Sequence, residues 1–241
     1  MTRRRWIADE VTGDRAALVG EHAAHLVRVL RAEIGQEFDI ATGDAVRQGT
    51  ITSISDDRVE FALGLVREVK ATPKMTLVLA IFKFDRMEWA IEKCTEIGVA
   101  RIIPVIARRS DAHLAAAAGK RHERWQRIVR QASEQARRTA PPEIATPVKL
   151  RGLAGDVVSG ELSTRIVLAE TEEDARLGEV LQSKPTDVAL AVGPEGGWAD
   201  EELAWFREAG WTSASLGSTI LRAETAAIVA TALALDALRC P

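Results

Sequence analysis

The order of apolar and polar positions divides the chain into a strand-rich first part and a second part in which strands and helices alternate. In the first part, short apolar runs are separated by turn-forming segments such as Thr42-Gly43-Asp44 and Ser55-Asp56-Asp57. The predicted strands cover 37–41, 49–54 and 59–65. One helix interrupts them at about 20–30, with Ala24, Val27 and Leu30 on one face. Strands this short and this closely spaced predict a small β-barrel.

After Pro73 the pattern changes to alternating strands and helices. The predicted strands cover 75–82, 101–106, 165–169, 188–192 and 214–216, and the predicted helices cover 86–97, 120–137, 201–209 and 224–238. Gly98 and Gly210 end two of these helices, as glycine commonly does just after a helix. This alternation predicts an α/β fold with a mostly parallel sheet and helices on both faces. With a linker at 70–73, the predicted domains are 1–72 and 73–241.

The distribution of charge along the chain says more about a binding partner than the net charge of the whole chain does. The net charge of −3 by itself argues against a nucleic-acid ligand. However, residues 101–151 carry 12 Lys/Arg and 4 Asp/Glu, whereas residues 152–241 carry 6 and 15. A basic segment beside an acidic one is typical of a local phosphate-binding face, although a solvated basic helix explains the charge equally well.

The cysteine content and the apolar stretches exclude several classes of protein. Cys94 and Cys240 are the two cysteines, and no residues have the spacing of a metal site, which argues against a disulfide scaffold and fits a reducing compartment. The basic N-terminus lacks the apolar run of a signal peptide, and the longest apolar stretch, 226–235, is too short to span a bilayer. We therefore expect a cytoplasmic protein that binds neither a membrane nor a metal.

The first segment with candidate chemistry is Val192-Gly193-Pro194-Glu195-Gly196-Gly197-Trp198, between a predicted strand and a predicted helix. In α/β sheets, ligands bind beyond the carboxyl ends of the strands, and glycines there let backbone groups approach a ligand closely. The spacing matches neither a phosphate-binding loop nor a dinucleotide fingerprint. A tight strand-to-helix turn without a ligand is the alternative interpretation.

The second segment is Leu216-Gly217-Ser218-Thr219-Ile220-Leu221-Arg222-Ala223-Glu224-Thr225-Ala226, which also joins a strand to a helix. Glu224 and Thr225 stand where a helix N-terminus accepts a carboxylate or a capping side chain. Arg222 is conspicuous because only six basic residues follow Arg151. A salt bridge from Arg222 to Glu195 or Glu224 is the alternative to a catalytic role.

Together the two segments resemble the signature of the SPOUT superfamily of RNA methyltransferases, and within it the RsmE family, which methylates uridine N3 in 16S rRNA. The resemblance extends over the whole chain. Its further matches are Arg86-Met87-Glu88-Trp89 followed by Glu92-Lys93-Cys94-Thr95-Glu96-Ile97-Gly98-Val99, Glu134-Gln135-Ala136-Arg137-Arg138 followed by Pro142-Glu143-Ile144, and His25 with Val29-Leu30-Arg31. One departure is Phe84 after Lys83, where many members carry a glycine.

The resemblance implies features that periodicity does not reveal. It implies that the second domain is a trefoil-knotted SPOUT domain and that the first is a PUA-like RNA-binding barrel. General rules of topology treat knots as nearly absent, so the knot is expected from the resemblance alone. The implied cofactor is S-adenosylmethionine (SAM), and the implied assembly is a homodimer. The implied substrate is 16S rRNA within the assembled small ribosomal subunit.

The resemblance also implies which residues form the SAM pocket and the catalytic site. The SAM-binding residues are Leu168, Glu170, Val192, Gly193, Pro194, Glu195, Gly196, Leu216, Gly217, Ile220, Leu221, Arg222, Glu224 and Thr225. Arg222 is expected to steer the uracil or to stabilise its developing negative charge, and Glu195 is a candidate catalytic carboxylate. Structural hydrogen bonds explain the two carboxylates, Glu195 and Glu224, equally well. The residue that accepts the N3 proton stays open, because all four histidines lie outside the two segments.

The expected RNA-binding residues are basic and scattered along the chain: Arg3, Arg4, Arg5, Arg31, Lys83, Arg108, Arg109, Arg137 and Arg138. Arg108 and Arg109 follow a predicted strand end, which places them near the pocket rim. The basic side chains between 120 and 130 are expected to form a solvated helix face. Two other functions stay open: a SPOUT methyltransferase acting on transfer RNA or a ribose hydroxyl, and a non-catalytic RNA-binding assembly factor.

Overall fold

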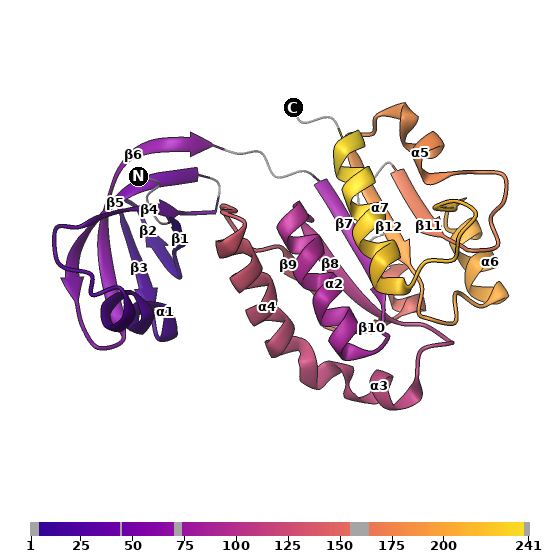
Figure 1. Ribbon diagram of the computed structural model, residues 1–241, viewed down its shortest axis with the longest axis horizontal. Coiled ribbons are helices and arrows are strands. Elements are labelled where there is room, and N and C mark those ends of the chain that lie inside the picture. Colours follow the sequence, from indigo (N-terminus) through magenta and orange to yellow (C-terminus); the bar gives the residue numbers. More distant parts are fainter. Residues whose placement is uncertain (1–4, 44, 70–73, 155–163, 239–241) are drawn as a thin grey trace. The chain divides into compact units, whose positions relative to one another are not determined.

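The chain forms two compact units, each with its own sheet (Figure 1). The computed structural model describes residues 5–43, 45–69, 74–154 and 164–238, so Arg3, Arg4 and the predicted linker at 70–73 lie outside the described residues. The first unit comprises Met1–Ala71 together with Ser133–Ala140, and the second comprises Thr72–Ala132 together with Pro141–Pro241. The division between residues 71 and 72 falls within the predicted linker, but the return of residues 133–140 to the first unit was not predicted.

The first unit is built on a six-stranded sheet with the order β1-β4-β5-β6-β3-β2. The strands are β1 (Arg5–Ile7), β2 (Glu10–Thr12), β3 (Arg15–Val19), β4 (Glu37–Ala41), β5 (Ala45–Ile54) and β6 (Arg58–Val69). All neighbouring strands are antiparallel except β1 and β4, which are parallel. Among the described residues no ladder joins β1 to β2, so the sheet forms a half-barrel around Leu18, Ile40 and Phe61.

The helix predicted at 20–30 is divided into two short pieces. A single α-helical turn, α1 (Glu21–Ala24), continues as a π-helical turn, η1 (His25–Val29). The fully buried side chains are Ala23 and Leu26, so the face predicted from Ala24 is only partly buried. The wider π turn changes the angle between successive side chains, which a period of 3.6 residues does not anticipate.

Residues 133–140 complete the first unit through contacts with its strands and with α1. Nη1 of Arg5 donates a 2.6 Å hydrogen bond to the carbonyl oxygen of Arg137. The N–H of Gly43 donates a 3.3 Å hydrogen bond to the carbonyl oxygen of Thr139. His22 Nε2 lies 3.8 Å from a carboxylate oxygen of Glu134. The first unit therefore depends on a segment that follows it by about sixty residues in the sequence.

The second unit has a seven-stranded sheet in the order β10-β8-β7-β12-β11-β13, with β9 paired to β8 as well. Its strands are β7 (Lys74–Ala80), β8 (Arg101–Ile106), β9 (Glu143–Ile144), β10 (Val148–Lys149), β11 (Thr164–Leu168), β12 (Asp187–Val192) and β13 (Thr212–Ala214). Every pairing in this sheet is parallel. The predicted α/β fold with a mostly parallel sheet is thereby confirmed.

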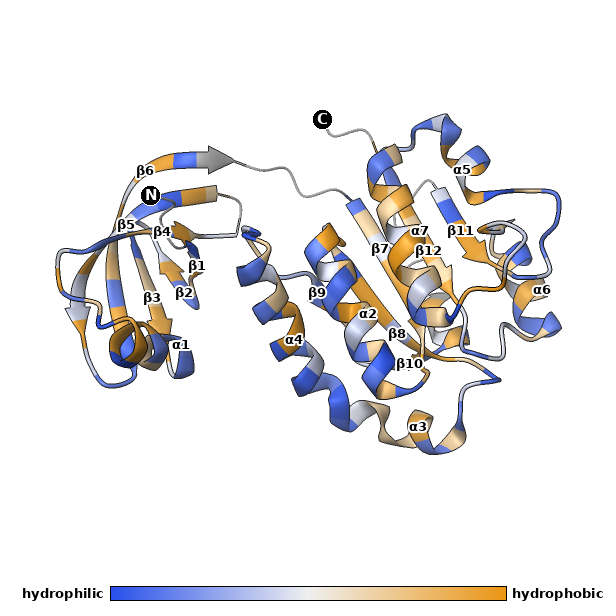
Figure 2. Cartoon of the chain, in the orientation of Figure 1, coloured by the Kyte–Doolittle hydropathy of each residue, from blue (hydrophilic) through white to orange (hydrophobic). Residues whose placement is uncertain are grey.

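Helices cover both faces of this sheet, as predicted. The helical elements are α2 (Phe84–Ile97), α3 (Ala112–Ala117), η2 (Ala118–Arg121), α4 (His122–Gln135), η3 (Leu150–Ala154), α5 (Leu177–Val180), η4 (Leu181–Ser183), α6 (Asp200–Glu208) and α7 (Ala223–Ala237). One face packs against α2, α4 and α7, with Trp125 and Leu77 in its core. The other packs against α6 and η3 around Phe206. Strands β7, β8 and β12 are correspondingly apolar along their length (Figure 2).

None of the described helices is long and apolar enough to cross a membrane. The described residues also contain no cluster of three or more His, Cys, Asp or Glu side chains arranged to hold a metal ion.

Candidate active site

A pocket of about 520 Å³ lies where β11, β12 and β13 end at the carboxyl edge of the second sheet. Most of the residues that line it come from three segments, 168–171, 192–198 and 214–223. Those that contribute from elsewhere are Arg86, Arg109, Asp200, Leu203 and Ala226. All three segments follow parallel strands, so their strand ends meet at one edge of the sheet. The pocket therefore contains both segments that the sequence singled out.

The loop after β12 turns sharply and brings backbone into the pocket. The N–H of Gly197 donates a 2.9 Å hydrogen bond to the carbonyl oxygen of Pro194. Gly197 has a φ of 68°, and a Cβ there would lie 3.0 Å from a carboxylate oxygen of Glu170. A Cβ at Gly193 would lie 3.2–3.3 Å from the indole of Trp198. A side chain would be a tight fit at both positions, and at Gly197 the positive φ favours glycine as well.

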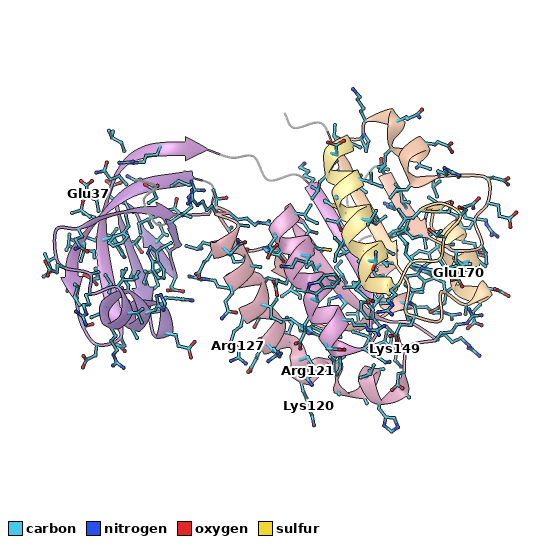
Figure 3. The ribbon with its side chains drawn as sticks, in the orientation of Figure 1. Glu37, Lys120, Arg121, Arg127, Lys149 and Glu170 are labelled. Carbon is cyan, nitrogen blue, oxygen red and sulfur yellow. The ribbon has the colours of Figure 1, made fainter. Side chains whose placement is uncertain are left out.

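Arg109 links this loop to the end of β8. Its Nη1 donates a 2.9 Å hydrogen bond to the carbonyl oxygen of Gly196. Arg109 lines the pocket, as does Glu170, whose position beside the loop can be followed in Figure 3. The sequence assigned Arg109 to RNA binding, and the structure shows in addition that it holds the glycine-rich loop.

The loop after β13 forms the opposite wall and leads into α7. Its start is fixed by Ser215, whose N–H donates to the carbonyl oxygen of Ala175 and whose carbonyl oxygen accepts from Leu177, both at 2.9 Å. Gly217 has a φ of 122°, a conformation that favours glycine. Ile220 lines the pocket with a side chain that is 83% exposed, and Arg222 is the residue at the N-cap of α7.

A group of three charged side chains lies beside the pocket and joins α2 to both loops. Arg86 in the first turn of α2 lies 3.5 Å from Glu195 and 3.8 Å from Glu224. The Glu224 side chain is 6% exposed, and its Oε2 atom has no hydrogen-bond partner among the described residues. The sequence suggested Arg222 as the alternative partner of these carboxylates, but the cation that contacts both is Arg86.

Most of the residues expected to bind SAM line one pocket. Those that do are Leu168, Glu170, Val192, Gly193, Pro194, Glu195, Leu216, Gly217, Ile220, Leu221 and Arg222. Gly196 is held just behind them by Arg109, and Glu224 contacts Arg86. Thr225 is not among the lining residues.

Several pocket residues were given no role from the sequence, among them Arg86, Trp198 and Asp200. Arg86 could have been found from its place in a helix that directly follows a strand of a parallel sheet, which puts it at the ligand-binding edge. Trp198 packs under Gly193, and its Nε1 atom is buried without a hydrogen-bond partner among the described residues. Its position in the glycine-rich motif was the available signal.

The residues expected to bind RNA are placed in different surroundings. Arg31, Lys83, Arg108, Arg109 and Arg137 are exposed. Arg108 forms a 2.7 Å ion pair with Glu201. Arg138 is half-buried, and burial lowers its pKa to about 10. Arg5 bonds to the backbone of Arg137.

The basic face at 120–130 is not purely solvated. Arg124 Nε lies 2.8 Å from Glu88, and the guanidinium of Arg121 lies 4.7 Å from the centre of the Phe84 ring. Phe84, the departure noted in the sequence, therefore packs against the start of α4, where it also contacts Trp125 edge to face. These side chains connect α2 to α4 within the second unit.

Comparison with known proteins places the chain in a family. Residues 70–235 match the family model described as an RNA methyltransferase domain. The ribosomal RNA small subunit methyltransferase E of Synechocystis sp. is 33% identical over 212 residues, which is 86% of this chain and 68% of that protein. The protein of the same name in Bacillus subtilis is 30% identical over 226 residues, covering 89% and 87% of the two chains.

Two solved structures are similar over nearly the whole chain. A methyltransferase of Legionella pneumophila, determined with bound SAM, has a TM-score of 0.83 at 30% identity and covers 98% of both chains. A ribosomal RNA small subunit methyltransferase E of Neisseria gonorrhoeae, also bound to SAM, has a TM-score of 0.82 at 27% identity with the same coverage. The chain therefore belongs to the RNA methyltransferase family and, within it, to the ribosomal RNA small subunit methyltransferase E group.

Proposed function

We propose that this protein transfers a methyl group from SAM to N3 of a uridine in 16S rRNA of the small ribosomal subunit. The observation that carries the proposal is the pocket formed by the two glycine-rich loops at the carboxyl edge of the sheet. Two relatives with similar structures over 98% of the chain were solved with SAM bound. The names of the relatives support ribosomal RNA as the substrate. The position within uracil rests on the resemblance to the RsmE family.

The pocket residues fit SAM in size and in chemistry. A volume of about 520 Å³ lies within the ordinary range of roughly 300–1,000 Å³ for small-molecule sites. Leu168, Val192 and Leu216 supply apolar walls, and carboxylates such as Glu170 and Asp200 in the lining would complement the positive charge of SAM. SAM supplies a methyl carbon bonded to a positively charged sulfur, which becomes a neutral thioether when a nitrogen lone pair takes the methyl group.

The protein's own part is to bind the uracil and to remove its N3 proton. N3 lies on the pairing edge of the base, so the uridine must be turned out of its RNA context. As the N3–H bond breaks, negative charge spreads onto the two carbonyl oxygens, where Arg222 at the pocket rim donates hydrogen bonds. Glu195, a carboxylate in the pocket wall, accepts the N3 proton. Arg86 lies 3.5 Å from Glu195 and orients it.

The finer architecture and the assembly belong to the same proposal. The loops at 192–198 and 214–223 form a trefoil knot, and the half-barrel of the first unit is a PUA-like RNA-binding domain. The homodimer forms on the outer face of α7, where Val229 and Leu233, one helical turn apart, are 38% and 42% exposed. The domains are 1–72 and 73–241, except that residues 133–140 belong to the first compact unit. The protein works on assembled small subunits in the cytoplasm.

The proposal is tested by incubating the purified protein with radiolabelled SAM and small subunits that lack the modification, then mapping the label by mass spectrometry. We expect one methyl group per subunit, on N3 of a uridine of 16S rRNA. Label on a ribose hydroxyl or on transfer RNA would assign the chain another substrate. Binding of SAM without transfer to any RNA would support the non-catalytic assembly factor.

A further inference from the structure

A second pocket, of about 270 Å³, lies at the same edge of the second sheet and has no assigned role. It is formed where β8 and β10 end and by the side of α6. Three cations, Arg108, Lys149 and Arg151, and the aromatic side chain of Trp205 line it. Figure 3 labels Lys149, which is the last residue of β10. Lys149, Arg151 and Trp205 belong to neither glycine-rich segment.

The charges of this pocket do not cancel. Glu201 is occupied by Arg108 at 2.7 Å. Glu202 accepts hydrogen bonds from the backbone N–H groups of Arg108 and Ala199, at 2.8 and 2.9 Å. Within the described part of the chain, no carboxylate forms an ion pair with Lys149 or Arg151. These two side chains are exposed, so their positive charge is available to an anion such as a phosphate.

Trp205 gives the pocket a flat apolar wall held in a defined orientation. The side chain is only partly buried, and its ring meets that of Phe206 edge to face, with 5.2 Å between centroids and 68° between planes. Phe206 is itself fully buried in the core. An anchored aromatic ring next to cations is the arrangement with which proteins bind single-stranded nucleic acid, because bases stack on the ring and phosphates meet the cations.

The second pocket and the candidate active site share no lining residue, but neighbouring residues of the same two segments line them. Arg109 lines the active site, whereas its neighbour Arg108 lines the second pocket. On α6 the same division occurs, with Leu203 in the active site and Trp205 in the second pocket. We propose that the second pocket binds one unpaired nucleotide of the RNA strand whose target base enters the active site. The base stacks on Trp205, and its phosphate lies by Lys149 and Arg151.

The size of the pocket supports a single nucleotide unit. About 270 Å³ is below the roughly 300–1,000 Å³ of pockets that enclose a whole small-molecule ligand. This inference rests on the proposed function, because it takes the RNA substrate as given. It adds that the protein recognises an unpaired neighbour of the target and not only the target base.

The electrostatic part is tested with the double variant Lys149→Ala/Arg151→Ala in the full-length protein. We expect a higher KM for small subunits at unchanged SAM affinity and nearly unchanged kcat. The slope of log affinity against log salt for single-stranded RNA should fall by roughly 0.7, the value for one phosphate contact on a single strand. The matched control is Lys120→Ala/Arg127→Ala, which removes two exposed cations of η2 and α4. Equal effects of the two double variants would overturn the site.

The stacking part is tested with Trp205→Leu and Trp205→Phe. Leucine should weaken RNA binding roughly 5- to 150-fold, the range found for base–aromatic stacking, and phenylalanine should restore most of it. Thermal unfolding and SAM binding identify a variant that has simply lost its fold. A measurement on the wild type avoids that problem: 4-thiouridine placed beside the target nucleotide should photocrosslink to α6.

The outcomes separate this inference from the proposed function. Absence of methyl transfer by the wild type would overturn the proposed function. Suppose that the wild type transfers methyl groups normally without crosslinking to α6, and that the Lys149/Arg151 and Trp205 variants bind RNA as the wild type does. That result would overturn only the proposed role of the second pocket. Uridine monophosphate serves as the probe for a free nucleotide. Binding of that mononucleotide as tight as that of the RNA strand would assign the pocket to a small ligand and contradict the proposal.

Discussion

The Nε atom of Arg86 lies 3.8 Å from a carboxylate oxygen of Glu224, a side chain that is only 6% exposed at the start of α7. Removing the cation leaves a buried carboxylate without a charged partner. We expect Arg86→Ala to lower the free energy of unfolding by about 1–3 kcal/mol, nearer the lower figure because Arg86 is one-third exposed. Urea unfolding measures this change.

The same pair offers a matched control. Glu224→Gln keeps the shape of the side chain and removes its charge. If the pair matters, the double variant Arg86→Ala/Glu224→Gln should lose less stability than the sum of the two single variants. Strict additivity would mean that the two side chains do not interact.

Arg222 stands at the N-cap of α7 with an exposed side chain on the pocket rim. Because the carboxylates nearby are contacted by Arg86, we expect Arg222 to act on the uracil. Arg222→Ala should then leave SAM affinity unchanged and slow single-turnover methylation on the order of a hundredfold or more. Arg222→Lys should rescue little, since a point charge does not reproduce a planar fork of donors. Wild-type methylation by the alanine variant would rule out this role.

Gly197 combines a positive φ of 68° with close approach to Glu170, so Gly197→Ala should distort the loop. We expect a clear loss of SAM affinity, measured by calorimetric titration. Gly178 in α5 is the control, because a Cβ there meets nothing within 4 Å. Gly178→Ala should bind SAM as the wild type does and be equally or slightly more stable. A Gly197→Ala variant with normal SAM affinity would show that the loop shape is unimportant.

Cys94 lies fully buried between α2 and α7, where the hydroxyl of Thr231 donates to its sulfur at 3.4 Å. Burial raises the pKa of the thiol to about 12. The unfolded chain loses this proton near the ordinary value of about 8.5, so stability should fall as pH rises from about 8.5 towards 12. At pH 9.5 the loss is about 1.4 kcal/mol relative to pH 7.5. Cys94→Ser should lack this component, and identical pH profiles would contradict it.

Arg137 and Arg138 are neighbours with different surroundings. Arg137 is exposed with a φ of 55°, whereas Arg138 is half-buried. Arg137→Ala should lower the salt dependence of RNA binding by about 1 unit of slope. Arg138→Ala should instead lower the stability of the first unit and leave the slope nearly unchanged. The reverse pattern would mean that the buried arginine carries the RNA contact.

Strands and loops were predictable where the local pattern decides the structure. The apolar run at 101–106 coincides with β8, and 37–41 coincides with β4. The glycine-rich segments were recognisable because close backbone approach permits few other residues. Strands β1, β2 and β3 were not predicted. Strands β1 and β2 have three residues each, and those of β2 are all exposed, so neither shows an alternating pattern of apolar and polar residues.

The contacts that complete the site depend on strand order, which periodicity does not contain. Arg86 reaches Glu195 because β7, which precedes α2, pairs with β12, which precedes the glycine-rich loop. Arg109 reaches Gly196 because β8 is the next strand on the other side of β7. In the sequence these partners are 109 and 87 residues apart, so only the folded sheet brings them together.

The place of residues 133–140 in the first unit affects how the chain folds during its own synthesis. Nascent domains usually fold as soon as they have emerged from the ribosome, N-terminal domain first. Strands β1 to β6 emerge early, yet Arg5 and Gly43 acquire their partners Arg137 and Thr139 only after more than a third of the second unit has been translated. The contacts that residues 133–140 make with the first unit are therefore missing for a long interval, in which association with another nascent chain or protection by a chaperone competes with correct completion.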